Sequence, residues 1–168
     1  MVVRAYEGVL RLAAGAGAVL LAAVFVAIIY DVTVRTLGAQ PPAWTAAFSE
    51  YAMLYATLLA APWLVGRRGH VAVESLVLFL PERARRWIQR LAYLLCIVVS
   101  LLLAAYAGEL TFQTYLRGEL DIRAVEVPRW LLFAVIPPSF ALIAVEFARL
   151  LVANRAHAED RTRVNEGL

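Results

Sequence analysis

Long apolar runs alternate with short charged segments along this chain, a pattern typical of a bundle of membrane-spanning helices. A helix needs roughly 20 predominantly apolar residues to cross a bilayer. Four runs meet this requirement and predict membrane helices at about 12–35, 44–65, 86–116 and 128–152. The polar tail at 153–168 is expected to be loosely ordered. The pattern predicts an all-α integral membrane protein that forms a single membrane domain over residues 1–168.

Glycine and proline residues mark where these helices end or bend. Gly38 and the pair Pro41-Pro42 separate the first helix from the second. The pair Pro137-Pro138 lies inside the fourth helix, and because proline cannot donate a backbone hydrogen bond, we expect this helix to bend. Small residues fill positions 13–18, and they predict close packing of the first helix against a neighbour. Simple alanine richness is the alternative explanation.

The segment from Arg67 to Arg90 sets the predicted orientation. It carries six arginines against two acids, and arginine-rich loops stay on the cytoplasmic side of a membrane. With both termini on that side, twelve arginines lie inside and four outside. The tryptophans support the same boundaries, because this side chain prefers the headgroup level and each one falls at a predicted helix end: Trp44, Trp63, Trp87 and Trp130. We therefore predict four transmembrane helices, N-in and C-in.

A short apolar stretch lies inside this segment, at about 71–80. It is too short to cross a bilayer, and its composition predicts an amphipathic helix that lies in the membrane interface. A re-entrant or coiled loop is the alternative. We expect the arginines on either side of the stretch to face lipid headgroups: Arg67, Arg68, Arg83, Arg85, Arg86 and Arg90.

Composition narrows the classes of function. Of the 168 residues, 62% are hydrophobic and only 17% are charged, whereas a soluble domain is about one quarter charged. The net charge is only +3, and nucleic-acid binding would need a basic face on a soluble fold, which this sequence does not predict. The single Cys96 is expected to be a small packing residue. His70 and His157 are expected in a loop and in the tail. The ligands of a haem bound between membrane helices would lie within the membrane-spanning segments, so a b-type cytochrome is not expected. We expect no enzyme activity, catalytic residue, metal or cofactor.

Few charged residues lie in or near the predicted membrane helices, and each of them is a candidate functional residue. Asp31 and Arg35 are four residues apart and are expected to pair. Glu50 is expected to meet Arg35 across a short loop or to reach a partner protein, with a purely structural pair favoured. Glu146, three residues before Arg149, is expected to pair with it. No row of acidic residues crosses the bilayer, as a proton- or ion-driven carrier would normally require.

The central segment resembles a known family. Its RRGHVAVE-x5-LP motif, followed by arginines, is similar to the cytoplasmic connector of the small membrane subunit of tripartite ATP-independent periplasmic (TRAP) transporters, the DctQ-like family. The residues at those positions are Arg67, Arg68, Gly69, His70, Val71, Val73, Glu74, Leu80 and Pro81. Upstream, the resemblance extends over Asp31 to Arg35, Trp44 and Glu50, and downstream over Pro128, Trp130 and Pro137. The family usually has aspartate where this chain has Glu74.

The resemblance implies partners. In this family a large multi-spanning subunit holds the substrate and sodium sites, and a periplasmic binding protein delivers an organic acid of the C4-dicarboxylate, keto acid or sialic acid class. The small subunit is non-catalytic and braces the large one in the inner membrane. A stand-alone oligomeric channel or carrier is the alternative, and a membrane enzyme or electron-transfer subunit is a more distant one.

We expect contacts with the large subunit or with lipid from a defined set of residues. Gly69 is expected to cap the second helix, and His70 to be an interfacial loop residue or a subunit contact. The set is Arg35, Trp44, Glu50, Arg67, Arg68, Gly69, His70, Glu74, Arg83, Arg85, Arg86, Trp87 and Arg90.

Overall fold

The structure is a computed structural model that describes the backbone of residues 2–68, 81–122 and 126–166. It describes the side chains of these ranges except those at 2–5, 68, 82–83, 85–86, 122 and 154–166. The predicted interfacial helix at 71–80, and the residues Gly69, His70 and Glu74, lie outside the described residues.

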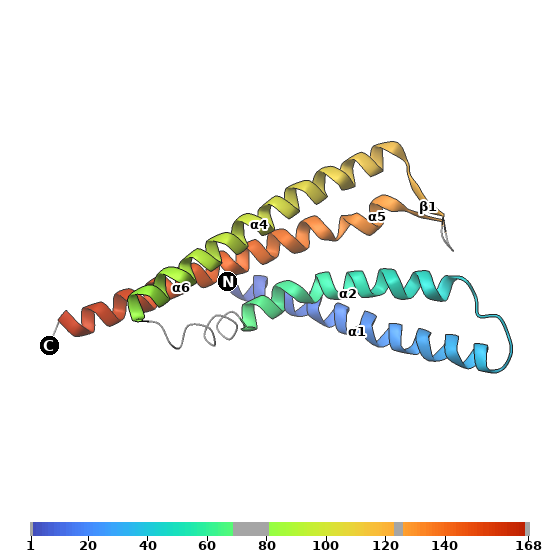
Figure 1. The fold of residues 1–168 in the computed structure, drawn as a ribbon, viewed down its shortest axis with the longest axis horizontal. Helices are drawn as coiled ribbons and strands as arrows, with labels where there is room; N and C mark the ends of the chain where they lie inside the picture. Colours follow the sequence, from blue (N-terminus) through green and yellow to red (C-terminus); the bar gives the residue numbers. More distant parts are fainter. Residues whose placement is uncertain (1, 69–80, 123–125, 167–168) are drawn as a thin grey trace.

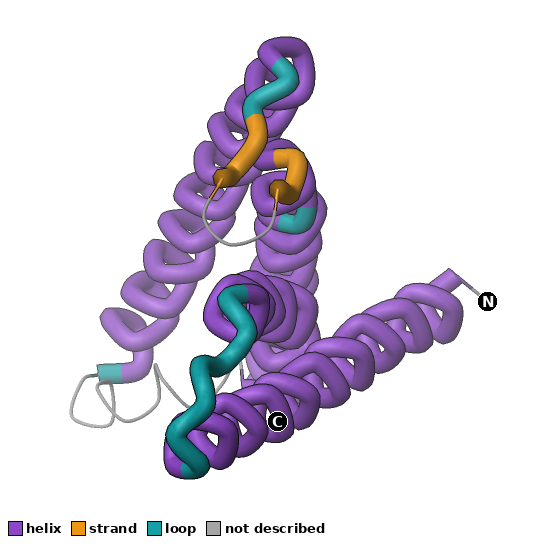
Figure 2. The backbone as a smooth tube through the Cα atoms, turned by 90° about the vertical axis from the view of Figure 1, so that its right-hand side faces the viewer, coloured by secondary structure: helices purple, strands orange, loops and turns teal. Residues whose placement is uncertain are grey.

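Two helical hairpins make up the fold (Figure 1). The first consists of α1 (Val2–Thr36) and α2 (Trp44–Arg68). In the second, α4 (Glu82–Arg117) lies against α5 (Arg129–Ala134) and α6 (Ile136–Glu166). Helix α2 contacts α6 and so joins the hairpins. They lie together near the chain termini and diverge toward the loop between α1 and α2, as Figure 2 also shows.

A short β-hairpin links α4 to α5, which the sequence analysis did not predict. Strand β1 (Leu120–Ile122) pairs antiparallel with β2 (Glu126–Pro128), with Asp121 opposite Val127. Apolar and polar residues alternate in β1, whereas in β2 the apolar Val127 and Pro128 follow Glu126. The fold is therefore helical with one added hairpin at the end of the molecule away from the termini (Figure 1).

Three helical stretches in the described part of the chain are long and apolar enough to cross a membrane: Tyr6–Thr36, Trp87–Arg117 and Arg129–Ala153. Helix α2 is not one of them, although its bounds agree with the predicted second helix. The reason is compositional, because α2 carries hydroxyl side chains and Glu50. These are tolerated on a helix that packs against both α1 and α6.

Two predicted boundaries were wrong. The first helix begins at Val2, ten residues before the apolar run at 12–35, and its added turns bury Leu10. The last helix continues to Glu166, beyond the boundary predicted at about 152. An apolar run marks only the part of a helix that lies in the hydrocarbon core. The helix itself continues into water where the following residues have sufficient helix propensity.

The chain leaves α1 through the predicted glycine. Gly38 has a φ of 77°, and its N–H donates to the Arg35 carbonyl at 3.1 Å. The N–H of Ala39 donates to the Val34 carbonyl, also at 3.1 Å. This pair of bonds is a Schellman motif, which needs a left-handed residue that glycine adopts without strain.

The expected close packing of α1 is confirmed at Gly17. This residue is buried against α2, and a Cβ atom built on it would lie 2.8 Å from the carbonyl oxygen of Ala56. Gly15, two residues earlier, has no such neighbour within 4 Å. The small residues at 13–18 therefore include one position where the two helix backbones require glycine.

The expected bend of the last helix is confirmed as a break at Val135. Helix α5 ends there and α6 begins at Ile136, because Pro137 and Pro138 cannot donate to the carbonyls one turn earlier. The N–H of Val135 points to the Phe133 carbonyl, so the Leu131 carbonyl loses its regular partner. The hydroxyl of Tyr55 on α2 donates to that carbonyl instead. A neighbouring helix thus satisfies the backbone at the break, as a membrane interior requires.

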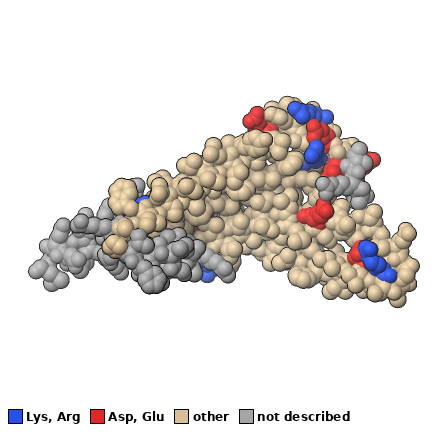
Figure 3. All heavy atoms as spheres, in the orientation of Figure 1, with Lys and Arg blue, Asp and Glu red and all other residues tan. Residues whose placement is uncertain are grey.

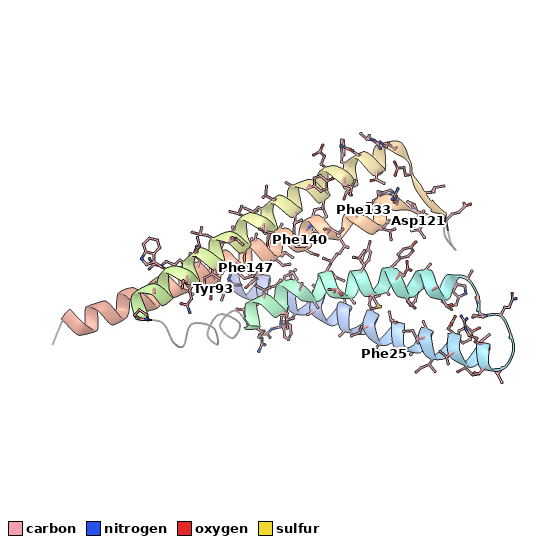
Figure 4. All side chains as sticks on the ribbon, in the orientation of Figure 1. Phe25, Tyr93, Asp121, Phe133, Phe140 and Phe147 are labelled. Carbon is pink, nitrogen blue, oxygen red and sulfur yellow. The ribbon has the colours of Figure 1, made fainter. Side chains whose placement is uncertain are left out.

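Aromatic side chains fill the contact between α4 and α6. The rings of Tyr93 and Phe147 lie 6.3 Å apart, and Figure 4 shows both between these helices. Phe25 in contrast points outward from α1 and is 63% exposed (Figure 4). Helix contacts therefore bury one side of each helix and leave a second apolar side uncovered within the chain.

We predict that Gly17→Ala destabilises the protein while Gly15→Ala does not. The added methyl at position 17 collides with backbone that cannot rotate away, and overpacking of this kind costs about 1–3 kcal/mol. Thermal unfolding of the two variants in the same detergent measures the difference. Equal melting temperatures for both variants and the unchanged protein would show that the α1–α2 backbone contact is not as close as described.

Candidate functional site

Charged side chains gather at the two ends of the molecule. Figure 3 shows acidic and basic residues over the β-hairpin and at the end of α1, both at one end of the molecule, and a largely uncharged surface along the helices on this face. We call the end with the α1–α2 loop and the β-hairpin the loop end, and the end with the chain termini the terminal end. Each holds a set of polar contacts.

The first contact at the loop end joins α1 to α2. The guanidinium of Arg35 lies 3.2 Å from the Asp31 carboxylate, which confirms that predicted pair. The second oxygen of Asp31 accepts a hydrogen bond at 2.8 Å from the hydroxyl of Thr45, which is 3% exposed. Asp31 therefore ties the end of α1 to the first turn of α2. Sequence reasoning missed Thr45, because its partner Asp31 lies 14 residues earlier on another helix.

A second group of contacts at the loop end holds the β-hairpin. Glu119 lies 3.1 Å from Arg129 and 3.6 Å from Arg117, and so joins the end of α4 to the start of α5. Across the hairpins, the Tyr51 hydroxyl donates to Asp121 at 2.8 Å. Asp121 lies on β1, at the position labelled in Figure 4. Tyr51 and Tyr55, one turn apart on α2, thus bond the second hairpin at two points.

The terminal end holds a buried acid. Glu146 on α6 is 4% exposed, and its carboxylate accepts a hydrogen bond from Arg149 at 2.9 Å, as the sequence predicted. Its other oxygen would lie only 2.8 Å from a Cβ atom at position 66, so Gly66 leaves room for it on α2. Arg149 also lies 3.9 Å from Glu7 and 5.0 Å from the centre of the Tyr6 ring, both on α1. This contact joins three helices.

A cavity of about 310 Å³ lies beside this contact. Its walls come from α1, α2 and α6, and its charged side chains are Glu7, Arg11, Arg67, Glu146 and Arg149. Arg67 stacks over Trp63, 5.2 Å from the ring centre. The sequence analysis placed Arg67 at a lipid surface but did not bring it together with Arg11 and Arg149, because those residues lie far apart along the chain.

The other predicted contact residues are placed as follows. Trp44, the first residue of α2, is 48% exposed and packs edge-on against Phe48 at 6.4 Å. Glu50 is exposed on α2, and its contact with Arg35 stays a prediction. Trp87, near the start of α4, is 74% exposed.

The basic residues of the central segment are described only in part. Arg90 is half-buried in α4, three residues after Trp87. The backbone of Arg68 ends α2, and that of Arg83, Arg85 and Arg86 lies in the first turns of α4, while their side chains lie outside what is described. Their lipid contacts stay predictions.

Groups that could hold a metal ion are not found among the described residues, in the sense of three or more histidine, cysteine or acidic side chains together. Cys96 is a free, half-buried thiol in α4.

Comparison with protein families gives a match over most of the chain. The family model described as the DctQ component of tripartite ATP-independent periplasmic transporters matches residues 24–156, which is most of the chain. No curated protein matches the sequence. The matched region includes all of α2, α4, the β-hairpin and α5, together with the loop-end contacts of Asp31, Thr45 and Glu119. The chain therefore belongs to the DctQ family, the small membrane component of TRAP transporters.

Proposed function

We propose that this chain is the small, non-catalytic subunit of a TRAP transporter and that it braces a large multi-spanning subunit in which the substrate crosses the membrane. The family match supports a place in a tripartite transporter. The bracing role rests on one observation about the described residues: apart from the hydrogen bond of Tyr55 to the Leu131 carbonyl, the side-chain contacts between helices lie at the loop end and the terminal end, and exposed apolar side chains lie between them.

Those apolar faces are large. In the most apolar stretch of α1, only 17% of the residues are buried within the chain, and the same share applies to α4. Exposed side chains include Leu12 at 76%, Val19 at 70% and Leu102 at 64%. A contiguous apolar surface of this kind marks contact with lipid or with another protein. A helical subunit with two such faces can meet lipid on one and a larger membrane protein on the other.

Two hydroxyl side chains between the ends form their hydrogen bonds within their own helix. The hydroxyl of Thr57 donates to the Met53 carbonyl at 2.8 Å, and that of Ser139 to the Val135 carbonyl at 2.7 Å. Binding a charged organic acid at membrane depth would need donors or cations directed into a shared space. The hydroxyls of Thr57 and Ser139 bond along their own helices instead, which supports a subunit that leaves substrate binding to its partner.

The proposal includes four membrane crossings with both termini in the cytoplasm. Helix α2 has 25 residues, and a helix of that length spans about 37 Å at 1.5 Å per residue, enough to cross the hydrocarbon core. It runs beside α1 in the opposite direction (Figure 1). The excess of arginine in the segment between α2 and α4 supports a cytoplasmic position for that segment.

The substrate and its energy source are proposed from the family resemblance. Uptake would be coupled to sodium, would depend on a periplasmic binding protein, and would serve an organic acid of the C4-dicarboxylate, keto acid or sialic acid class across a bacterial inner membrane. The second candidate is a small oligomeric channel or carrier formed by this chain alone. The observation in favour of this second candidate is the exposed apolar faces, which an oligomer of this chain would bury between its copies.

We predict that the chain alone moves none of these acids. In proteoliposomes with an inward sodium gradient, uptake should require the large subunit and the binding protein, and should disappear when sodium is replaced by potassium. Radiolabelled substrate inside the vesicles is the measurement. Saturable uptake by vesicles that hold this chain alone would support the channel or carrier and contradict the bracing role.

We predict that single cysteines report the crossings of α1 and α2 when the native thiol is removed by Cys96→Ser. Gly8→Cys and Ala84→Cys should react with a membrane-impermeant maleimide only after the cells are permeabilised, whereas Gln40→Cys should react in intact spheroplasts. Position 84 tests α2 directly, because it would react from outside if α2 did not cross. That pattern would overturn the four-helix topology.

A further inference from the structure

The cavity at the terminal end is lined by charged side chains that have no part in the proposed bracing role. Three arginines from three helices line it, Arg11 from α1, Arg67 from α2 and Arg149 from α6, against two acids. One acid, Glu146, is committed to Arg149 at 2.9 Å. The other, Glu7, lies 4.0 Å from Arg11 and 3.9 Å from Arg149, the outer limit of an ion pair. The cavity therefore holds more positive charge than its acids neutralise.

Of the three arginines in the cavity, Arg67 is the one available to bind an anion. Within the described ranges its guanidinium makes the stacking contact with Trp63 at 5.2 Å and no ion pair. Stacking engages the flat face of a guanidinium and leaves its N–H groups, which lie in the plane, free to donate. Those donors are suited to a planar or tetrahedral oxyanion, for which arginine is the preferred protein group.

The level of the cavity in the membrane identifies the source of such an anion. Arg11 is the last charged residue before the uncharged run 12–30, Arg67 is the first after the uncharged run 51–66, and Glu146 is the first after the uncharged run 130–145. All three apolar stretches therefore end at one level, where Figure 1 shows the end of α2 beside α6 and the start of α1. A helix leaves the hydrocarbon core at the layer of the lipid headgroups, so phosphate groups lie at the depth of the cavity.

The geometry points to a binding site for the phosphate group of an anionic phospholipid, held in this cavity between α1, α2 and α6 by Arg67 and Arg11. The volume of about 310 Å³ lies at the lower end of the range for small-molecule sites, which suits one headgroup better than a larger ligand. Arg149 keeps Glu146 neutralised at the cavity wall, and Glu7 opposes the anion. The site would join the two helical hairpins through a lipid at their point of contact.

The test is a lipid titration of the full-length chain in a non-ionic detergent, followed by native mass spectrometry. The probes are phosphatidylglycerol and, for comparison, phosphatidylcholine, whose choline cation faces the arginines unfavourably. Arg67→Gln should lower the apparent affinity for phosphatidylglycerol roughly fivefold, the effect expected of one arginine at a headgroup. Glu7→Gln should raise it by a similar factor, because it removes the opposing charge.

The matched control is Arg117→Gln, which removes an exposed arginine at the loop end while Glu119 keeps Arg129. It should leave the affinity unchanged. Arg149 is not varied, because its removal would leave Glu146 buried without its partner. Circular dichroism of each variant checks that the helices are intact. Equal loss in Arg67→Gln and Arg117→Gln, or no change in either, would overturn the site.

A further arm separates the lipid from a soluble anion. Inorganic phosphate added without lipid should change neither the melting temperature nor the phosphatidylglycerol affinity. Stabilisation by inorganic phosphate that depends on Arg67, without lipid binding, would assign the cavity to a free anion and overturn the lipid site. The inference needs the chain to lie in a membrane but not its assembly with a large subunit, so its failure would leave the proposed function standing.

Discussion

The close approach of α2 to helices on both of its sides is the constraint on which the rest of the structure depends. On one side, Gly17 brings the backbone of α1 against the Ala56 carbonyl. On the other, Gly66 leaves room for the Glu146 carboxylate of α6. In lipid no water is released when apolar helices meet, so packing at short distance and polar contacts must hold them together. Helix α2 provides both, and it is accordingly less apolar than its neighbours.

The polar contacts are arranged by depth. Asp31 with Thr45, and Tyr51 with Asp121, fasten the loop end, while Glu146 with Arg149 fastens the terminal end. Between these levels, the Tyr55 hydroxyl meets a carbonyl that the helix break at Val135 exposes. A scaffold fixed at both ends in this way can hold a constant shape while a partner moves. This is the physical sense in which a small subunit with uncovered apolar faces can brace a larger one.

Much of this architecture could be predicted from the apolar runs, from the glycine and proline residues that end or break helices, and from charged residues close together in the sequence. Gly38, Pro137, the Asp31–Arg35 pair and the Glu146–Arg149 pair were all predictable, because each depends on residues less than two turns apart. The β-hairpin was missed because a helix-length apolar search passes over strands of three residues. The joining of Arg11, Arg67 and Arg149 was also missed, since it depends on how the hairpins meet. The extension of α6 to Glu166 shows that polarity alone does not end a helix.

The central claim is that another membrane protein covers an apolar face of this chain. Co-expression with the large subunit of the same transporter, followed by purification through a tag on this chain and mass measurement of the eluted complex in detergent, tests it most directly. The account predicts that the two chains elute together in a fixed ratio without the binding protein. Elution of this chain by itself, as a monomer or as an oligomer of its own copies, would contradict it.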